Sequence, residues 1–344
     1  MATSFDQKKP LSLSIQLCLL VLGCLMLIAP TGTSGRASAQ TQDGNPTSVP
    51  EKQSKTALSS SLSARDEFLK LKSELVVLSI SVTDSIGRLA PGLKQEEFQI
   101  QEDDVPQSIR FFSTEDIPIT VGIILDISGS MRSKVMRARE AVRQFVQWSN
   151  PQDEFFAIAF NRNVVLLADF TDGEVLLSYI PFLQAKGRTA MYDAVYEGVL
   201  KLKQAHYGKR VLLIISDGQD NSSRHGFRAL KKLMRESDAQ IYTIGTPDPT
   251  QYDDYFERMG ISILQQISKL AGGRHFTVMG ASALEPVCAS IARELRQQYT
   301  IGYMSSNTSR DGKWRELKVR VQKGKGQKFR VNYKRGYYAL LEQP

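Results

Sequence analysis

The sequence predicts an α/β fold, a doubly wound and mostly parallel Rossmann-like sheet, joined to an antiparallel β-sandwich-like domain formed by the flanking segments. Residues 119–125 and 211–215 are continuous apolar runs, which are typical of strands buried on both faces of a parallel sheet. Between residues 115 and 298 strands alternate with amphipathic helices, an order that gives a parallel sheet covered by helices. On both sides of this stretch, apolar and polar residues alternate as in antiparallel strands.

Residues 1–39 are predicted to be a secretory signal peptide. Two lysines precede an apolar run over residues 11–30, and an Ala-x-Ala cleavage site ends at Ala39. The run is close to the length that spans a bilayer, so an uncleaved anchor is an alternative. Lipidation at Cys24 is another, although the apolar residues after this cysteine argue against it. We therefore expect an exported protein, periplasmic or secreted, with anchoring through an uncleaved N-terminal segment as the alternative.

The cysteines fit export from a bacterial cell. Cys18 and Cys24 lie in the predicted signal peptide, so Cys288 alone remains after cleavage and no intrachain disulfide can form. An exported chain without disulfides is more typical of a bacterial envelope or secreted protein than of a small disulfide-stapled domain. We expect Cys288, which lies in an apolar helical pattern, to be a small buried hydrophobic residue.

The segment before the predicted parallel sheet begins with a linker and continues as β-structure. Residues 40–64 are polar and without periodicity, which predicts a disordered linker, and a helical turn is expected near residues 65–71. Residues 65–114 form the N-terminal β segment, with strands expected at 75–82, 97–102 and 108–112. Short strands with acidic turns between them suggest half of an antiparallel sandwich.

Residues 115–298 are predicted to form the α/β domain. Besides the two buried runs, strands are expected at 153–160, 164–170, 240–245 and 275–278. Amphipathic helices are expected at 133–148, 190–205, 226–236, 260–271 and 282–297.

The C-terminal β segment, residues 299–344, contains three alternating strands, at about residues 299–304, 317–322 and 329–334. Three strands are few for an independent sheet, and the N-terminal segment has the same difficulty. The economical solution is one sandwich made by both segments, with the α/β domain inserted between them. Two separate small β units are the alternative.

A candidate metal site follows the first buried strand. Asp126 ends the apolar run, and Ser128 and Ser130 follow at alternate positions. A carboxylate at the end of a buried strand is costly unless something pairs with it. These side chains can supply three hard oxygens to one small divalent cation such as Mg²⁺. The alternative is that Ser130 caps a helix beginning near Met131.

Two further oxygen-bearing residues are predicted to lie at the same edge of the sheet. Asp217 follows the second buried strand, and Thr189 begins a helix between the two strands. Ligands of open α/β sheets bind outside the carboxyl ends of parallel strands, where both acids are expected. Asp220 and Asn221 are candidates for supporting hydrogen bonds, although a turn role suits them equally.

The three segments together resemble the von Willebrand factor A domain and its metal-ion-dependent adhesion site, whose pattern is Asp-x-Ser-x-Ser, a distant Thr and a distant Asp. The resemblance implies a Mg²⁺ (or Mn²⁺) site that holds a carboxylate of a partner protein. Its ligands here would be Asp126, Ser128, Ser130, Thr189 and Asp217, with Asp217 bound directly or through water. A site rich in small hydroxyl groups disfavours Ca²⁺.

The preceding β segment resembles that of the acidobacterial von Willebrand-A-related exported proteins. The likeness is carried by Val82-Thr83-Asp84, Gly87, Gly92-Leu93, Phe98 and Glu102-Asp103. That family largely lacks an assigned function, so this resemblance informs architecture more than role.

Hydrolytic chemistry has little support in the sequence. The three histidines, at positions 206, 225 and 275, are scattered along the chain, and none lies beside Asp126 or Asp217. A haloacid-type phosphatase would have a second Asp where this chain has Ser128. No Gly-x-Ser-x-Gly elbow and no P-loop is present. We therefore expect a binding protein and no enzyme.

The charge balance favours anionic partners. The chain has a formal net charge of +8, and no nucleic-acid-binding motif appears. The basic residues of the C-terminal strands are usually explained by a solvated strand face, and docking on an anionic envelope surface is the alternative. These residues are Lys318, Arg320, Arg330 and Lys334.

The expected function is metal-dependent capture of an Asp or Glu of a partner protein, as in an adhesion module. The alternative is a structural or assembly module of the cell envelope in which the metal stabilises the fold. A metal-dependent hydrolase is third.

Overall fold

The computed structural model describes residues 75–180, 183–247, 254–279, 281–324 and 327–341. The predicted signal peptide, linker and helical turn lie outside these residues. In this part of the chain, no helix combines the length and the apolar character needed to cross a bilayer.

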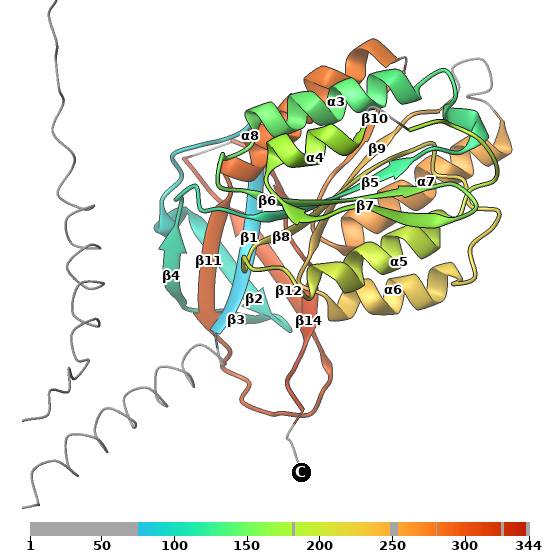
Figure 1. The fold of residues 1–344 in the computed structure, drawn as a ribbon. Helices are drawn as coiled ribbons and strands as arrows, with labels where there is room; N and C mark the ends of the chain where they lie inside the picture. The colour runs from blue at the N-terminus through green and yellow to red at the C-terminus, as the bar shows by residue number, and fades with distance from the viewer. Residues whose placement is uncertain (1–74, 181–182, 248–253, 280, 325–326, 342–344) are drawn as a thin grey trace, which may run out of the picture. The chain divides into compact units, whose positions relative to one another are not determined.

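The α/β domain contains a six-stranded, mostly parallel sheet, as the sequence predicts (Figure 1). In spatial order the strands are β10 (His275–Thr277), β9 (Gln240–Gly245), β8 (Arg210–Ser216), β5 (Thr120–Asp126), β6 (Glu154–Phe160) and β7 (Val164–Thr171). The β7 strand alone runs antiparallel to its neighbour, because a tight turn joins it to β6. The two predicted buried runs, β5 and β8, are adjacent and parallel in the middle of this sheet.

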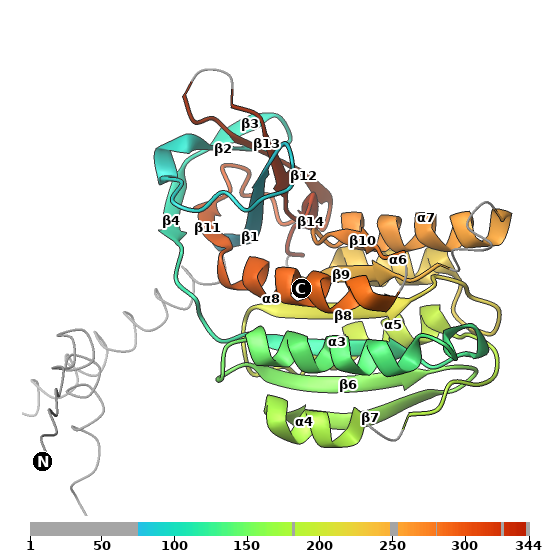
Figure 2. The same ribbon diagram turned by 90° about the horizontal axis from the view of Figure 1, so that it is seen from above.

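Helices cover both faces of the sheet (Figures 1 and 2). One face packs against α3 (Val135–Trp148), α4 (Gly173–Tyr179) and α8 (Leu284–Arg296), and the other against α5 (Met191–Leu202), α6 (Phe227–Glu236) and α7 (Tyr255–Leu270). Alternate residues of β5 therefore enter different cores, with Ile123 on the first side and Ile124 on the second. This two-sided burial explains the continuous apolar run.

Two helices differ from the prediction. The α7 helix begins five residues earlier than expected, because the Asp254 side chain caps it by accepting a hydrogen bond from the Phe256 amide at 2.7 Å. Its first turn carries exposed aromatic side chains, so the apolar pattern of the sequence begins only later. The short α4 helix was not predicted; Asp172 caps it through the Val175 amide at 2.9 Å.

The flanking segments form two four-stranded antiparallel sheets, and each sheet contains strands from both ends of the described chain. The first has the order β13 (Phe329–Asn332), β1 (Leu75–Asp84), β11 (Tyr299–Met304) and β4 (Ile109–Ser113). The second has the order β14 (Gly336–Tyr338), β12 (Trp314–Val321), β2 (Phe98–Glu102) and β3 (Val105–Gln107). Both sheets contribute to one apolar core. The α/β domain is thus an insertion between the strands of this sandwich.

A buried polar network joins the sandwich to the α/β domain. The amide of Gln298, between α8 and β11, donates hydrogen bonds to Ser81 Oγ of β1 and to Tyr242 OH of β9, both at 3.0 Å. Tyr242 OH in turn donates to Glu294 Oε1 of α8 at 2.9 Å, and Arg274 forms an ion pair with Glu294. Because these groups are shielded from water, each depends on the others for its hydrogen bonds.

We predict that Tyr242→Phe lowers the free energy of unfolding by about 1–3 kcal/mol, because it removes a hydrogen-bond partner from buried Glu294 and Gln298. Urea denaturation measures this loss. Tyr179→Phe is the matched control, since Tyr179 is 47% exposed on α4. Equal stability of the two variants would contradict a stabilising role for the network.

Candidate functional site

The two predicted acids meet at the carboxyl edge of the parallel sheet. Asp126 ends β5, Asp217 directly follows β8, and Leu125 pairs with Ile215 in the ladder between these strands. Both aspartates are completely buried. The sheet therefore places two carboxylates side by side where water cannot solvate them.

Both carboxylate oxygens of Asp126 accept hydrogen bonds. Oδ1 accepts from the Ser128 amide at 2.8 Å, and Oδ2 accepts from Ser216 Oγ at 2.6 Å. The hydroxyl oxygens of Ser128 and Ser130 lie 3.0 Å apart. Sequence reasoning gave Ser216 no role; the available signal was a hydroxyl residue directly before Asp217.

The loop that carries Thr189 is attached to both acid-bearing loops. The Gly129 amide donates to the Gly187 carbonyl at 3.0 Å, which joins this loop to the Ser128–Ser130 turn. On the other side, the Thr189 amide donates to Asn221 Oδ1 at 2.9 Å. The five predicted ligands therefore lie at the end of β5 or on loops at one edge of the sheet.

The two residues proposed to support the site bind backbone groups. Asn221 holds Thr189 as described, and its own amide donates to the Thr189 carbonyl at 2.9 Å. Asp220 Oδ2 accepts from the Tyr192 amide at 2.8 Å, at the start of α5. Asn221 thus fixes the backbone of Thr189, and Asp220 fixes the start of the helix that follows it.

The carboxylate of Asp217 is only partly satisfied. Its Oδ1 accepts from the Gln219 amide at 3.1 Å. Its Oδ2 is buried and has no hydrogen-bond partner among the described residues. A buried, unpaired carboxylate oxygen is strongly unfavourable, and a positive ligand at this atom would relieve the cost.

The electrostatics of Asp126 lead to the same conclusion. Burial, and then the charge of Asp217, raise the pKa of the Asp126 carboxyl to about 7. A bound cation would offset both causes. No group of three or more His, Cys, Asp or Glu side chains gathers in the described part of the chain, so soft or nitrogen-rich metal sites are not found there. Two carboxylates with three hydroxyl groups form a hard oxygen set that fits Mg²⁺.

Each histidine contacts other residues. His206 pairs with Glu154, and His225 Nδ1 lies 2.8 Å from Asp193 Oδ1. His275 Nδ1 lies 2.9 Å from Thr243 Oγ1, and burial lowers the pKa of His275 to about 4.

The four basic residues of the C-terminal strands do not share one strand face. Arg330 lies on β13, whereas Lys318 and Arg320 lie on β12 in the other sheet of the sandwich. Lys318 Nζ binds Asp104 Oδ1 at 2.5 Å. Lys334 Nζ is turned inward, donating to the Arg235 carbonyl at 2.9 Å, and burial lowers its pKa to about 8. The alternating sequence pattern did not reveal which strands pair.

A glycine contact brings α7 against the loop that carries Asp217. Gly218 has a φ of +86°, and a Cβ atom there would lie 2.3 Å from the Gly260 carbonyl oxygen of α7. Only glycine suits such a conformation and such an approach. The contact holds the backbone after Asp217 in place.

Comparisons with known proteins agree with the fold. The family model described as the von Willebrand factor type A domain matches residues 121–219, which include all five predicted ligands. The resemblance to the von Willebrand factor A domain is thus confirmed for this segment, whereas the intact metal-ion-dependent adhesion site and the acidobacterial relationship stay predictions. No curated protein matches the sequence.

Solved structures with a similar fold include three bacterial proteins. BatB from Bacteroides thetaiotaomicron is 18% identical, with 51% of this chain and 98% of that chain covered and a TM-score of 0.42. A von Willebrand factor type A protein from Catenulispora acidiphila is 13% identical, with 78% and 74% covered and a TM-score of 0.46. The pilus adhesin SpaC from Lactobacillus rhamnosus GG is 11% identical, with 75% and 49% covered and a TM-score of 0.46.

We predict that Gly218→Ala lowers the free energy of unfolding more than Gly87→Ala does. Both residues have φ near +87°, so both variants incur about 1–2 kcal/mol of left-handed strain. Only the Cβ at position 218 meets backbone atoms, which adds about 1–3 kcal/mol of overpacking. Chemical denaturation of the two variants checks the difference. Equal losses would show that the α7 contact is not tight.

We predict that Asp217→Asn has opposite effects with and without divalent cation. In chelator the variant should melt at a higher temperature than the parent protein, because the repulsion between Asp126 and position 217 is gone. In Mg²⁺ at a concentration of 100 times Kd, the free energy of unfolding of the parent protein should rise by about 2.7 kcal/mol. The variant should lose most of this increase. Thermal unfolding in both conditions measures this, with exposed Asp238→Asn as the control. An equal Mg²⁺ shift in both variants would exclude Asp217 as a ligand.

Proposed function

We propose that the protein is an exported protein-binding module that captures an acidic residue of a partner through a Mg²⁺ (or Mn²⁺) site. The observation that carries the proposal is the buried, unpaired Oδ2 of Asp217 beside the buried carboxylate of Asp126. Asp126, Ser128, Ser130, Thr189 and Asp217 would hold the ion.

The residues of this chain determine what such a site can bind. Asp126 and Asp217 supply all the negative charge of the set, and the other three side chains are neutral hydroxyls. When bound, the divalent ion would offer an open coordination position to an oxygen from outside. Because three of the five side chains are neutral hydroxyls, the ion would keep more positive character than in an all-carboxylate site, which favours an incoming carboxylate.

The surrounding loops add positive charge. Arg132, Arg162, Arg188 and Arg224 are exposed on the loops that adjoin the site, and Arg188 is anchored by donating to the Asn221 carbonyl at 2.7 Å. Residues 127–134, 161–163 and 183–190 contain no Asp or Glu, whereas the loop that carries Arg224 also contains Asp220. A positive surface around the site supports recognition of an acidic partner, because it attracts that partner before contact.

A pull-down experiment tests the proposal. The immobilised protein is incubated with the envelope and secreted fractions of the source cell, and the proteins that it retains are identified. We expect immobilised protein to retain a partner in Mg²⁺ and to lose it in chelator or with Asp126→Ala. Asp238→Ala removes an exposed acid elsewhere and should retain the partner. Asp-to-Ala substitution in the captured partner should then identify the acidic residue.

Two outcomes would contradict metal-dependent capture. A partner retained equally in Mg²⁺, in chelator and by Asp126→Ala would place the contact elsewhere on the molecule. If Asp126→Ala lowers the melting temperature in Mg²⁺ but leaves partner retention unchanged, the site serves the fold, as in a structural envelope module.

A further inference from the structure

A hollow with a volume of about 330 Å³ lies where the sandwich meets the C-terminal end of α7. Four cationic side chains line it from four separate segments, and the lining contains no Asp or Glu. The cations are Lys269 of α7, Arg274 before β10, Arg330 of β13 and Arg335 after β13. This hollow lies at the opposite edge of the parallel sheet from Asp126, because α7 runs antiparallel to the parallel strands.

The charges in this hollow are not balanced. Arg274 is paired with buried Glu294. Among the described residues, Lys269, Arg330 and Arg335 form no ion pair, and all three are exposed. Arg335 is fixed in position, since its guanidinium lies 4.3 Å from the ring centroid of Tyr333. Like charges that lie close together repel one another, and an anion bound between them would attract each of them.

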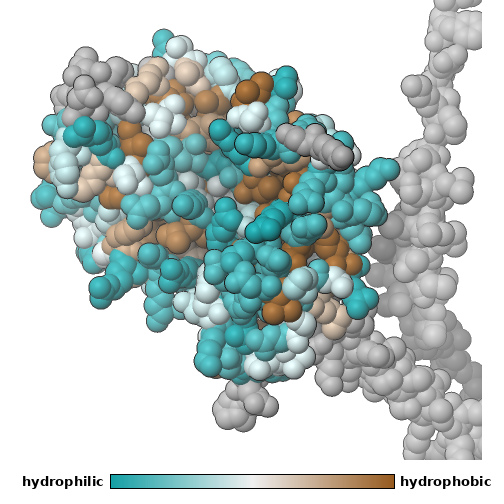
Figure 3. All heavy atoms as spheres, turned by 180° about the vertical axis from the view of Figure 1, so that it is seen from behind, coloured by the Kyte–Doolittle hydropathy of each residue, from teal (hydrophilic) through white to brown (hydrophobic). Residues whose placement is uncertain are grey.

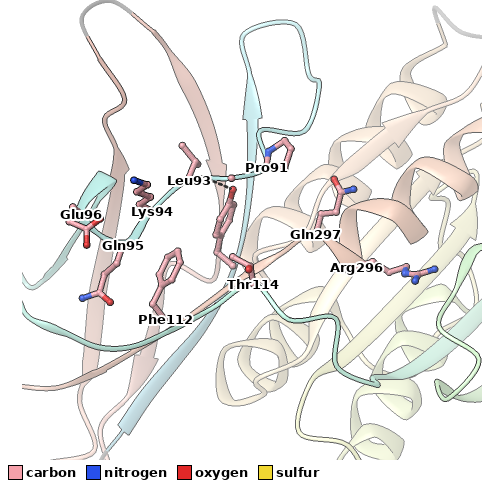
Figure 4. Close-up of a pocket in the computed structure, with 11 residues that line it drawn as sticks. Pro91, Leu93, Lys94, Gln95, Glu96, Phe112, Thr114, Arg296 and Gln297 are labelled. Atoms are coloured by element: carbon pink, nitrogen blue, oxygen red, sulfur yellow. Dashed lines mark hydrogen bonds between the residues drawn. The ribbon is translucent and has the colours of Figure 1, made fainter. Parts of the chain in front are cut away.

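Another hollow, of about 550 Å³, shows the contrast (Figure 4). It lies between the sandwich and the end of α8, and its lining includes both Lys94 and Glu96. Its other cation, Arg296, already binds Asp116 with an Nε to Oδ2 distance of 2.8 Å. Exposed apolar side chains form only scattered patches on the face shown in Figure 3. The unbalanced charge therefore distinguishes the hollow at α7 from this one. A hollow beside α6 is also lined by basic residues without acids, but all four of them belong to that single helix.

Neutral donors complete the lining of the hollow. Thr83 and Asn332 bring a hydroxyl and an amide group to it, whereas the Ser268 hydroxyl already donates to the Gln265 carbonyl at 3.1 Å. The ring nitrogens of His275 lie 2.9 Å from Thr243 Oγ1 and Thr277 Oγ1, so this side chain is occupied on both sides. The hollow thus offers fixed positive charge together with uncharged hydrogen-bond donors.

Two glycines create the close packing that brings these cations together. Gly272 has a φ of +75°, and a Cβ there would lie 2.3 Å from the Lys334 amide nitrogen. A Cβ on Gly273 would lie 2.1 Å from the Ile241 carbonyl oxygen of β9. The turn between α7 and β10 therefore lies directly against β9 and the residues after β13. This packing is what places Arg274 beside Arg330 and Arg335 in one hollow.

We propose that this hollow binds a tetrahedral oxyanion, the phosphate or sulfate group of a small ligand. Guanidinium groups match such oxygens with paired hydrogen bonds, and a lysine adds a point charge. The volume exceeds what a free ion needs and lies within the range of small-molecule sites, so the group would be carried by a sugar-sized molecule. Such a ligand would bridge the sandwich and the α/β domain.

Calorimetric titration of the full chain with inorganic phosphate tests this proposal, at constant ionic strength adjusted with chloride. We expect saturable binding that Lys269→Ala and Arg330→Ala each weaken about tenfold, because each removes a charge-assisted contact. Arg320→Ala is the matched control, since Arg320 is exposed on β12 outside the hollow. Asp126→Ala should bind phosphate normally, which separates this site from the proposed metal site.

Parallel titrations with sulfate and acetate define the ligand. Binding of phosphate but not sulfate assigns a phosphate group, and the reverse assigns a sulfate group; acetate should bind much more weakly than either. The proposal is overturned if no saturable binding occurs, if acetate binds as well as phosphate and sulfate, or if Arg320→Ala weakens binding as much as Arg330→Ala. Because Lys269 and Arg330 are exposed, circular dichroism should show both variants folded as the parent protein is.

Discussion

The burial of two like charges at one edge of the parallel sheet is the constraint on which the site depends. Asp126 and Asp217 end neighbouring buried strands, so the fold that creates the apolar cores also removes water from both carboxylates. Hydrogen bonds from Ser128 and Ser216 satisfy Asp126, but one oxygen of Asp217 stays unpaired. The burial of these two carboxylates is unfavourable for folding, and such unfavourable groups are typical of functional sites.

The loops around this edge are rigidly connected to one another. Backbone hydrogen bonds join the Gly129 turn to Gly187, and Asn221 joins the same loop to the end of β8. Side chains that are already held in position lose little conformational freedom when they bind an ion. A site of this kind can therefore be selective with few contacts. The contact of Gly218 with α7 extends this rigidity to the helix layer.

Much of this arrangement follows from the sequence, and the exceptions have physical causes. The continuous apolar runs of β5 and β8 predicted a parallel sheet and brought Asp126 and Asp217 to one edge, because local periodicity reports burial directly. Strand pairing is not local, so the sequence did not show that Lys318 and Arg330 belong to different sheets. The start of α7 was missed because a cap at Asp254, and not apolar periodicity, defines it. The unpaired oxygen of Asp217 depends on the packing of loops distant in sequence.

The interleaved sandwich imposes an order on how the chain can fold. Leu93 and Tyr299 form a hydrogen bond although they are 206 positions apart, and β1 has both of its sheet neighbours in the C-terminal segment. During synthesis the N-terminal strands therefore wait, with open edges, until almost the whole chain has been made. The inserted α/β domain has its own cores and parallel sheet, so it can fold first and bring the two ends of the chain together. In this sense the α/β domain is also the scaffold that brings the two parts of the sandwich together, and truncation within the C-terminal β segment would leave the N-terminal strands exposed to pairing with other chains.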